Sequence, residues 1–364
     1  MTESVWALGL MSGTSLDGID AALIKTDGRT VEEFGPSITE ALDDELRLRI
    51  LMALEGKGDM LGLENDITLA HIDMVEKLLK HADMKKKDIE VIGFHGQSIL
   101  HQPENNISWQ MGNGALMAYK TGVNTVCDFR RKDVAAGGEG APLVPLYHAA
   151  LVRDMDLPIA VLNIGGIANV TWVGRSEAAA EKLLAMDIIA FDTGAGNVLI
   201  DEWMRRTSGT TYDKDGALAA QGTIHLSIVE NYLNDDYFKK YPPKSLDRGA
   251  FNLDLVKDLS PEDGAATLAA FTAEAAIAAQ KHFPAKAKRW LVCGGGRHNP
   301  VIMKHLSDSL QNVESIEAID LEGDAIEAQA FAFLAVRNMH RLPLSLPTTT
   351  GAIRAVTGGA FYPA

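Results

Sequence analysis

Glycine-rich turns that directly follow apolar runs are the residues best suited to chemistry in this sequence. They read MSGTSLDGID at 11–20, NIGGIAN at 163–169 and FDTGAGN at 191–197. Glycine lets backbone amides approach an anion, hydroxyls can donate to phosphate oxygens, and carboxylates can hold Mg²⁺ through water. The first segment could also be a plain polar hairpin. Because no Walker A lysine motif is present, any phosphate binding is predicted to use hairpin turns.

Asp192 is the leading candidate for a catalytic carboxylate. It ends an apolar run, and Gly194 and Gly196 follow before a helix predicted over 197–206. Such a turn would offer amide donors to phosphate and leave the carboxylate facing the same cavity. Asp192 could instead cap the helix, but capping alone does not require two glycines. The pattern therefore favours a functional role.

Two motifs in the first half offer donors to a sugar or a carboxylate. GFHGQ at 93–97 and DFRRKD at 128–133 each follow a predicted strand, where open α/β sheets place ligands. His95 could instead be a structural histidine, and Arg130 could simply pair with Asp133.

Two features near the C-terminal end allow both a functional and a structural interpretation. The triple glycine at 294–296 could form a flat slot for an adenine or a ribose, or only a flexible connection. Glu327 lies among apolar residues of a helix predicted over 324–341, either as a functional carboxylate or at the edge of the apolar stripe.

Strand and helix signals alternate along the chain, which predicts an α/β fold. Strands are expected at 5–10, 19–24, 89–94, 125–127, 159–164, 168–173, 188–191 and 289–293, and earlier helices at 43–54 and 67–82. Each half opens with a glycine-turned hairpin, which indicates a duplicated architecture. The tract Gly137–Pro145 has the composition of a hinge between the halves.

Composition limits the classes of partner. The chain has 364 residues, and 34 Lys+Arg against 49 Asp+Glu give a formal charge of −15. This charge disfavours nucleic acid and anionic lipid, so small molecules are the expected partners. The two cysteines are too few for a disulfide framework, which favours a cytoplasmic setting. The most apolar helical stretch, 265–280, is too short to span a membrane.

Taken together, the motifs closely resemble those of the anhydro-N-acetylmuramic acid kinase family. The resemblance covers the whole chain and rests on MSGTSLDG at 11–18, FHGQ at 94–97, DFRRKDVAAGG at 128–138, GAPLVP at 140–145, NIGG at 163–166, FDTG at 191–194 and CGGG at 293–296.

The resemblance implies two related actin-like ATPase (ribonuclease H-like) α/β domains with nucleotide in the cleft between them. Residues 1–140 plus 345–364 would form the domain on the sugar side, and 141–344 the domain on the nucleotide side. The family uses ATP, Mg²⁺ and water to open 1,6-anhydro-N-acetylmuramic acid and phosphorylate O6. N-Acetylmuramic acid 6-phosphate and ADP result, as part of cell-wall recycling. A homodimer is a further expectation.

The resemblance also implies roles for individual residues. Asp192 would be the general base that activates water, and Glu327 would help to orient that water. The expected ATP-binding residues are Gly13, Thr14, Ser15, Leu16, Asp17, Gly18, Ile19, Asp20, Gly165, Gly166, Gly194, Gly196, Asn197, Gly294, Gly295 and Gly296. Asp17 and Asp20 would hold Mg²⁺ indirectly. The expected sugar-binding residues are His95, Gln97, Arg130, Arg131 and Asp133.

The sequence departs from the family pattern at two places. Ala195 stands where the family usually has proline, and residues 246–249 read LDRG where the family commonly has TGRE.

The alternative functions are those of an ordinary amino-sugar kinase of the same fold and of a non-enzymatic actin-like or chaperone-like ATPase. A glycoside hydrolase would leave the glycine turns unexplained.

Overall fold

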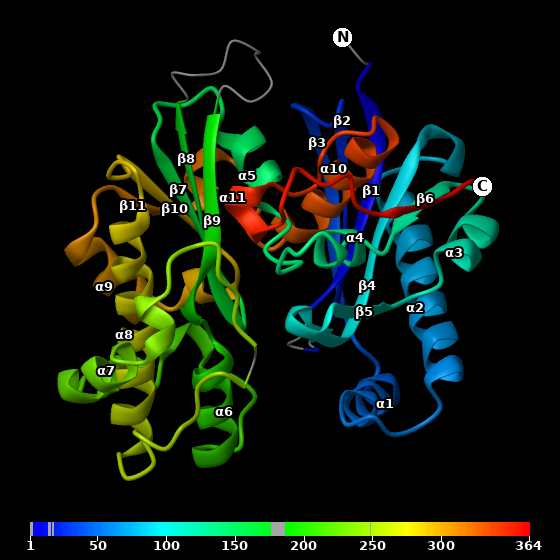
Figure 1. Ribbon diagram of the computed structural model, residues 1–364. Helices are drawn as coiled ribbons and strands as arrows, with labels where there is room; N and C mark the ends of the chain where they lie inside the picture. Colours follow the sequence, from blue (N-terminus) through cyan, green and yellow to red (C-terminus); the bar gives the residue numbers. More distant parts are fainter. Residues whose placement is uncertain (1–2, 14–15, 17, 176–185, 248) are drawn as a thin grey trace. The chain divides into compact units, whose positions relative to one another are not determined.

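The computed structural model describes residues 3–13, 16, 18–175, 186–247 and 249–364. The chain forms two compact units, one made of Met1–Leu151 with Ala325–Ala364 and the other of Val152–Asp324 (Figure 1). Each unit holds a mixed β-sheet with helices, so the α/β class expected from the sequence is confirmed.

The unit boundaries differ from the expected borders at 140/141 and 344/345. The glycine-rich tract before Pro145 belongs to the first unit, because the Gly140 N–H donates to the buried Asp133 carboxylate at 2.7 Å and the Glu139 N–H donates to the Thr350 carbonyl at 2.6 Å. Residues from Ala325 onward also belong there, because the helix that they begin packs on the sheet of the first unit.

The sheet of the first unit has the order β12-β6-β4-β1-β2-β3, with β5 beside β4. β1, β2 and β3 pair antiparallel, whereas β4 is parallel to β1 and β6 is parallel to β4. The strands are β1 (Val5–Ser12), β2 (Gly18–Thr26), β3 (Val31–Ala41), β4 (Val91–Gln102), β5 (Ile107–Met111), β6 (Asn124–Cys127) and β12 (Ala360–Tyr362).

The second unit repeats the central part of this plan. Its sheet has the order β11-β10-β7-β8-β9, in which β7, β8 and β9 pair antiparallel and β10 and β11 continue parallel to β7. The strands are β7 (Ile159–Ile164), β8 (Ile167–Arg175), β9 (Met186–Ala195), β10 (Arg289–Cys293) and β11 (Val313–Ser315). This shared arrangement is the ribonuclease H-like strand order, and it supports the expected duplication.

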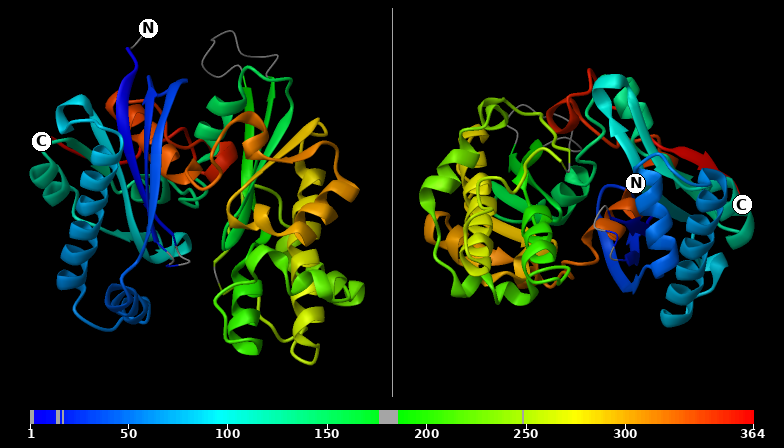
Figure 2. Two further views of the ribbon diagram at one scale, coloured as in Figure 1. Left: turned by 180° about the vertical axis from the view of Figure 1, so that it is seen from behind. Right: turned by 90° about the horizontal axis from the view of Figure 1, so that it is seen from below.

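Helices cover both faces of the first sheet. Figure 2 shows α2 in blue and α10 in orange on opposite sides of it. Leu8 and Leu10 of β1 join the core cluster that includes Val75 and Leu78 of α2. The helices of this unit are α1 (Asp44–Leu54), α2 (Met60–His81), α3 (Gly114–Thr121), α4 (Arg131–Ala135), α5 (Pro145–Val152), α10 (Ile326–Met339) and α11 (Pro347–Thr350).

The opposite face of that sheet approaches α10 so closely that two strand positions need glycine. A Cβ added at Gly9 would lie 1.8 Å from the carbonyl oxygen of Ala328, and one added at Gly93 would lie 2.0 Å from that of Phe331. Both obstacles are helix backbone, which cannot move aside as a flexible side chain can. Glycine therefore sets the distance between this sheet and α10.

The second unit packs an alanine-rich helix against its sheet. α8 begins at Pro261 after the N-cap Ser260, whose hydroxyl accepts the Asp263 N–H. A Cβ at Gly194 of β9 would lie 2.8 Å from the Cβ of Ala275 in α8. The helices of this unit are α6 (Val198–Thr207), α7 (Leu226–Leu233), α8 (Pro261–Ala279) and α9 (Pro300–Ser309). Among the helices in the described ranges, none combines the length and apolarity needed to cross a membrane.

Each expected element overlaps an observed one, although β4 extends to Gln102 and α2 begins at Met60. Of the strands that were not expected, β3 is the longest. This strand pairs with β2 at the sheet edge, and most of its residues are exposed or half-buried. It contains Gly35 and Pro36, together with charged residues. Such a composition resembles a loop in the sequence, although edge strands tolerate it.

We predict that Gly93→Ala destabilises the protein, because the added Cβ meets the α10 backbone. Overpacking of this kind costs about 1–3 kcal/mol. Gly249→Ala is the matched control, since nothing lies within 4 Å of a Cβ built there. Thermal unfolding should show a lower midpoint for Gly93→Ala and little change for Gly249→Ala. Equal midpoints in the two variants would contradict the proposed contact.

Candidate active-site residues in each unit

A row of polar side chains crosses the second sheet near the ends of β7 and β9. Asn163 pairs in register with Asn169, and Asn169 pairs with Asp192. Residues in register on neighbouring strands project from the same face. Asn163 and Asp192 are only 5% and 6% exposed and Asn169 is half-buried, so most of this polar row is shielded from water. The buried Asn169 Oδ1 has no hydrogen-bond partner among the described residues, so it could accept from a ligand.

Backbone groups of a distant loop hold Asp192 at both its main chain and its side chain. The Leu246 N–H donates to Asp192 Oδ2 at 2.8 Å, and the Asp192 N–H donates to the Lys244 carbonyl at 3.1 Å. The Tyr237 hydroxyl donates to the Asp192 carbonyl at 2.5 Å. Asp192 belongs to β9 and not to the cap of α6, because the residue at that N-cap position is Asn197.

The two glycine turns of the second unit meet at the carboxyl ends of β7 and β10. Asn163 and Cys293 are in register in this parallel pair, so the turns that follow them are neighbours. The Asn197 side chain donates to the Ile164 carbonyl at 3.1 Å, and the Gly196 and Asn197 N–H groups donate to the Gly166 and Gly165 carbonyls. The predicted residues of these turns therefore form one cluster with the start of α6.

Within this cluster some glycines are required by packing and others face open space. A Cβ at Gly196 would lie 2.2 Å from the Gly165 carbonyl oxygen, and one at Gly294 would lie 2.3 Å from Asn163 Oδ1. A Cβ at Gly165 or at Gly295 would meet no atom closer than 3.6 Å. The open side of the cluster thus offers backbone that a phosphate or a ribose can approach, which fits the expected nucleotide.

Gly194 is another predicted ATP-binding glycine that packing within its own unit requires. The atom nearest to a Cβ built there belongs to Ala275 of α8, so the space is filled by the core of its own unit. Packing of α8 against β9 is therefore enough to explain the glycine. Thr272 of α8 reinforces this contact by donating to the Ala195 and Gly196 carbonyls.

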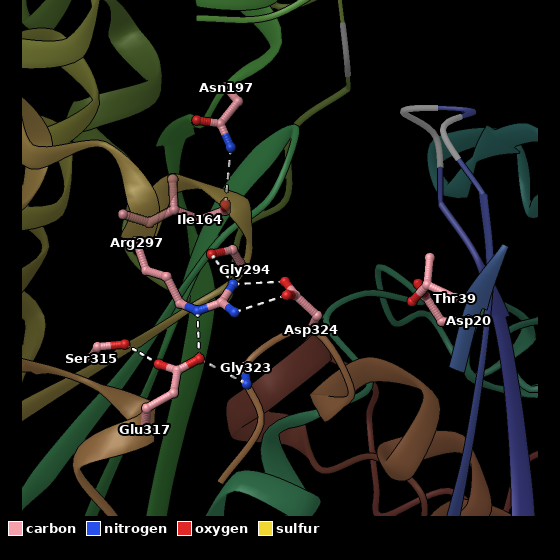
Figure 3. A network of polar contacts seen from close by, with 10 residues as sticks. All are labelled: Asp20, Thr39, Ile164, Asn197, Gly294, Arg297, Ser315, Glu317, Gly323 and Asp324. Carbon is pink, nitrogen blue, oxygen red and sulfur yellow. Dashed lines mark hydrogen bonds and ion pairs between the residues drawn. The ribbon is translucent and has the colours of Figure 1, made fainter. Parts of the chain in front are cut away.

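A buried arginine braces the triple-glycine turn (Figure 3). Arg297 donates to both oxygens of Asp324 at 2.7 and 2.9 Å, to Glu317 Oε1 at 2.8 Å, and to the Gly294 carbonyl at 3.0 Å. Glu317 Oε1 also accepts the Gly323 N–H at 3.1 Å. This network fixes the turn after β10. Arg297 at its centre is only 8% exposed.

In the first unit, the turn after β1 is tied to β4. The Gln97 side chain donates to the Gly13 carbonyl at 3.3 Å, and the Leu16 N–H donates to the same oxygen at 3.3 Å. The buried Gln97 Oε1 has no hydrogen-bond partner among the described residues, so it could accept from a ligand. Thr14, Ser15 and Asp17 lie outside the described residues.

The rest of the predicted first turn lies in β2. A Cβ at Gly18 would lie 2.5 Å from the Glu40 carbonyl oxygen of β3, so strand packing requires glycine there. Ile19 is buried in the core of the unit. Asp20 accepts the Thr39 hydroxyl at 2.6 Å (Figure 3). The expected role of Asp20 in holding a hydrated cation stays a prediction.

Arg130, which follows β6, contacts His95, which lies within β4. Arg130 Nε and Nη2 lie 3.2 and 3.0 Å from His95 Nε2, and Nη1 donates to the Gly140 carbonyl at 2.7 Å. Burial, and then the Arg130 charge, hold the pKa of His95 well below its ordinary value. The neutral ring accepts at Nε2 and donates from Nδ1 to the Gly96 carbonyl at 2.7 Å. His95 thus orients Arg130.

Asp133 is 1% exposed and serves the same arginine indirectly. It accepts the Gly140 N–H at 2.7 Å, and the Gly140 carbonyl is the one that Arg130 contacts. Asp133 also accepts the Thr350 hydroxyl at 2.7 Å and the Ser345 hydroxyl. These partners make Asp133 the organiser of the surrounding loops.

Arg131 lines a cavity of about 250 Å³ in the first unit. The cavity is also lined by His95, Gln110 and Asp128. Arg131 Nε donates to the Ser108 carbonyl at 3.3 Å and lies 3.5 Å from Asp128 Oδ1. Hydrogen-bonding side chains around a small hollow suit a hydroxylated ligand such as a sugar.

Glu327 lies in the first turn of α10, where it is half-buried. Its neighbours Ile326 and Ala328 are buried, so this carboxylate stands at the edge of an apolar helix. The close approach of α10 to the Gly9 and Gly93 positions fixes the helix that carries it.

Comparison with known proteins decides the family. The model of the family described as anhydro-N-acetylmuramic acid kinase matches residues 5–364. The chain belongs to the anhydro-N-acetylmuramic acid kinase family. A member from Rhodospirillum rubrum is 51% identical over 99% of this chain and 95% of its own length. Another, from Paramagnetospirillum magneticum, is 49% identical over 98% of this chain and 99% of its own length.

Three parts of this anhydro-N-acetylmuramic acid kinase family member that contact or pair with Asp192 were not predicted from the sequence. They are Asn169, Tyr237 and the segment 244–246. Asn169 could have been found, because the hairpin is symmetric about Gly166 and so places Asn169 opposite Asn163. The other two carry no local signal, since they reach Asp192 only through the tertiary fold.

We predict that the Arg297 network makes the second unit sensitive to acid. Partial burial alone would raise the pKa of Glu317, but hydrogen bonds from Ser315 and Arg297 outweigh it and lower the pKa from 4.5 to about 2. As the pH falls, Glu317 of the unfolded chain therefore binds a proton at a higher pH than Glu317 of the folded protein does. The stabilisation is full above the unfolded pKa and is lost as the pH falls towards about 2.

Urea unfolding of the protein and of Glu317→Gln at several pH values measures this effect. The difference in unfolding free energy between them should shrink as the pH falls through this window. Glu230→Gln, at an exposed position of α7, controls for the removal of a carboxylate. A Glu317→Gln difference that stays constant with pH would rule out this role.

Proposed function

We propose that this chain is an ATP-dependent kinase that opens 1,6-anhydro-N-acetylmuramic acid with water and phosphorylates O6. The products would be N-acetylmuramic acid 6-phosphate and ADP, and the role would be the recycling of cell-wall fragments. Membership of the anhydro-N-acetylmuramic acid kinase family over residues 5–364 is the observation that carries this proposal. Asp192, buried near the end of β9, would supply the required carboxylate.

Asp192 would act as the general base. Its carboxylate would take a proton from the water that attacks the anomeric carbon, and the bond from that carbon to the bridging oxygen would break. The released O6 would then attack the γ-phosphorus, and the bond to the β-phosphate oxygen would break. The Leu246 amide fixes one carboxylate oxygen, so the base is oriented before substrate arrives.

The second carboxylate and the sugar donors would come from the first unit. Glu327 would orient the attacking water from the first turn of α10. Arg130, held by His95 and Gly140, would provide a charged donor for the carboxylate of the sugar, Arg131 would provide a further donor, and Gln97 Oε1 would accept from a sugar hydroxyl. Asp133 would contribute through its hold on Gly140.

The nucleotide would bind through the glycine cluster of the second unit. Gly165 and Gly295 offer open backbone, and Asn197 fixes the hairpin beside them. Mg²⁺, when bound with the nucleotide, would neutralise phosphate charge. Asp20 is proposed to hold this Mg²⁺ ion through water.

We place the reaction in the cytoplasm, where ATP is available. Cys127 and Cys293 are both buried and are not joined by a disulfide, in keeping with a reducing compartment. A homodimer remains a prediction from the family resemblance.

We predict that ADP release requires the 1,6-anhydro sugar. The test compares ADP formation with that sugar, with free N-acetylmuramic acid, with N-acetylglucosamine and with no sugar. In ¹⁸O-labelled water, the label should enter the anomeric position of the product, with free sugar in labelled water as the exchange control. An ordinary sugar kinase would not add label, and a non-enzymatic ATPase would release ADP equally in all four reactions.

We also predict that Asp192→Asn abolishes turnover while ATP affinity stays largely unchanged. The amide keeps the size of the side chain but cannot accept a proton from water. ADP release and ATP binding by calorimetry measure the two properties separately. Full activity in this variant would remove Asp192 as the base.

A further inference from the structure

Lys244 is a buried cation in the loop that holds Asp192. It is 7% exposed, and its ammonium donates to the Tyr237 carbonyl at 3.1 Å. The Nζ atom lies 4.4 Å from the ring centroid of Tyr237 and 5.7 Å from that of Phe191. Both aromatic residues are themselves contacts or neighbours of Asp192.

Keeping a charge at this position is costly. Burial, together with the charges of Lys281 and Lys240, lowers the pKa of Lys244 to about 8, whereas Asp192 raises it. The carbonyl and the two rings offset part of the desolvation. A buried cation beside the proposed base needs a reason beyond stability, since an apolar side chain of the same volume often packs at least as well.

The contacts around Lys244 form a closed circuit with Asp192. The ammonium of Lys244 reaches the Tyr237 backbone, and the Tyr237 hydroxyl reaches the Asp192 carbonyl at 2.5 Å. The Lys244 carbonyl accepts the Asp192 N–H at 3.1 Å, and the Leu246 amide that follows holds Asp192 Oδ2 at 2.8 Å. One residue thus fixes both the strand end and the loop that supplies the carboxylate's donor.

We propose that Lys244 is a positioning residue for Asp192, whose ammonium pins the segment 237–246 so that the Leu246 amide orients the carboxylate. This inference rests on the proposed function, in which Asp192 activates water. Lys244 itself acts through backbone and aromatic groups, so it affects the reaction without transferring a proton.

The expected kinetic effect is specific. Displacing a catalytic group by about 1 Å can cost up to about a hundredfold in rate. Lys244→Met keeps the length of the side chain and removes the charge. It should lower kcat by about tenfold to a hundredfold, with the KM for sugar and ATP changed less than about twofold. Lys244→Arg should recover most of the loss, because arginine retains a cationic donor.

Lys281→Met is the matched control. Lys281 donates to the Phe238 carbonyl at 2.8 Å, one residue along from the Lys244 acceptor, but among the described residues it makes no hydrogen bond to Asp192, Tyr237 or Lys244. The Lys281→Met substitution removes a cation close to Lys244 and should leave kcat within about twofold of that of the unsubstituted protein. Thermal midpoints of all variants separate loss of fold from loss of positioning.

The pH dependence gives a second readout. The charged and titratable groups that face Lys244 are Asp192 from β9, Lys240 and Tyr237 from the preceding segment, and Lys281 and His282 after α8. Deprotonation of Lys244 above about pH 8 should lower kcat. Lys244→Arg should lack this decline, because its guanidinium stays charged.

Each outcome separates the inference from the function on which it rests. If the unsubstituted protein releases no ADP with the 1,6-anhydro sugar, the proposed function fails. If it is active but folded Lys244→Met keeps kcat within about twofold, or Lys281→Met loses as much, only the role of Lys244 fails. Should Lys244→Met not fold, Tyr237→Phe decides: it keeps the ring but removes the donor to Asp192, and an unchanged kcat would overturn the circuit.

Discussion

The candidate sites depend on one constraint in each sheet, which is the parallel pairing of the first strand with a later one. The pairs are β1 with β4 and β7 with β10. β7 and β10 end in register, so the hairpin glycines and the triple glycine become neighbours although they are far apart in sequence. The parallel pair β1 and β4 likewise brings Gly13, which follows β1, beside Gln97, which lies within β4. Side chains and open backbone gather at these edges because parallel strands present their carboxyl ends together.

Features that depend on local requirements could be predicted from the sequence. Glycine after an apolar run, and a carboxylate at the end of such a run, reflect backbone geometry that a few consecutive residues impose, and the observed hairpins follow it. The repeated architecture was also recognisable, because each half opens with a glycine-turned hairpin. The expected interdomain cleft remains a prediction.

What the sequence could not provide depends on contacts between distant segments. Gly194 looked like a phosphate turn, but the space beside it belongs to Ala275 of α8. Asp133 looked like a ligand or a partner of Arg130, and its oxygens instead accept from Gly140, Ser345 and Thr350. The residues at 246–249 that depart from the family pattern begin with Leu246, whose contribution is a main-chain amide that many side chains would preserve.

The way in which the two units share the chain has a consequence for biosynthesis. The second unit is one continuous stretch, whereas the first needs α10 and β12 from the far end of the chain. As the polypeptide leaves the ribosome, the sheet face at Gly9 and Gly93 stays without its helix until α10 emerges. The second unit can therefore complete its core before the first, whose sheet must wait for α10 and β12 to be translated.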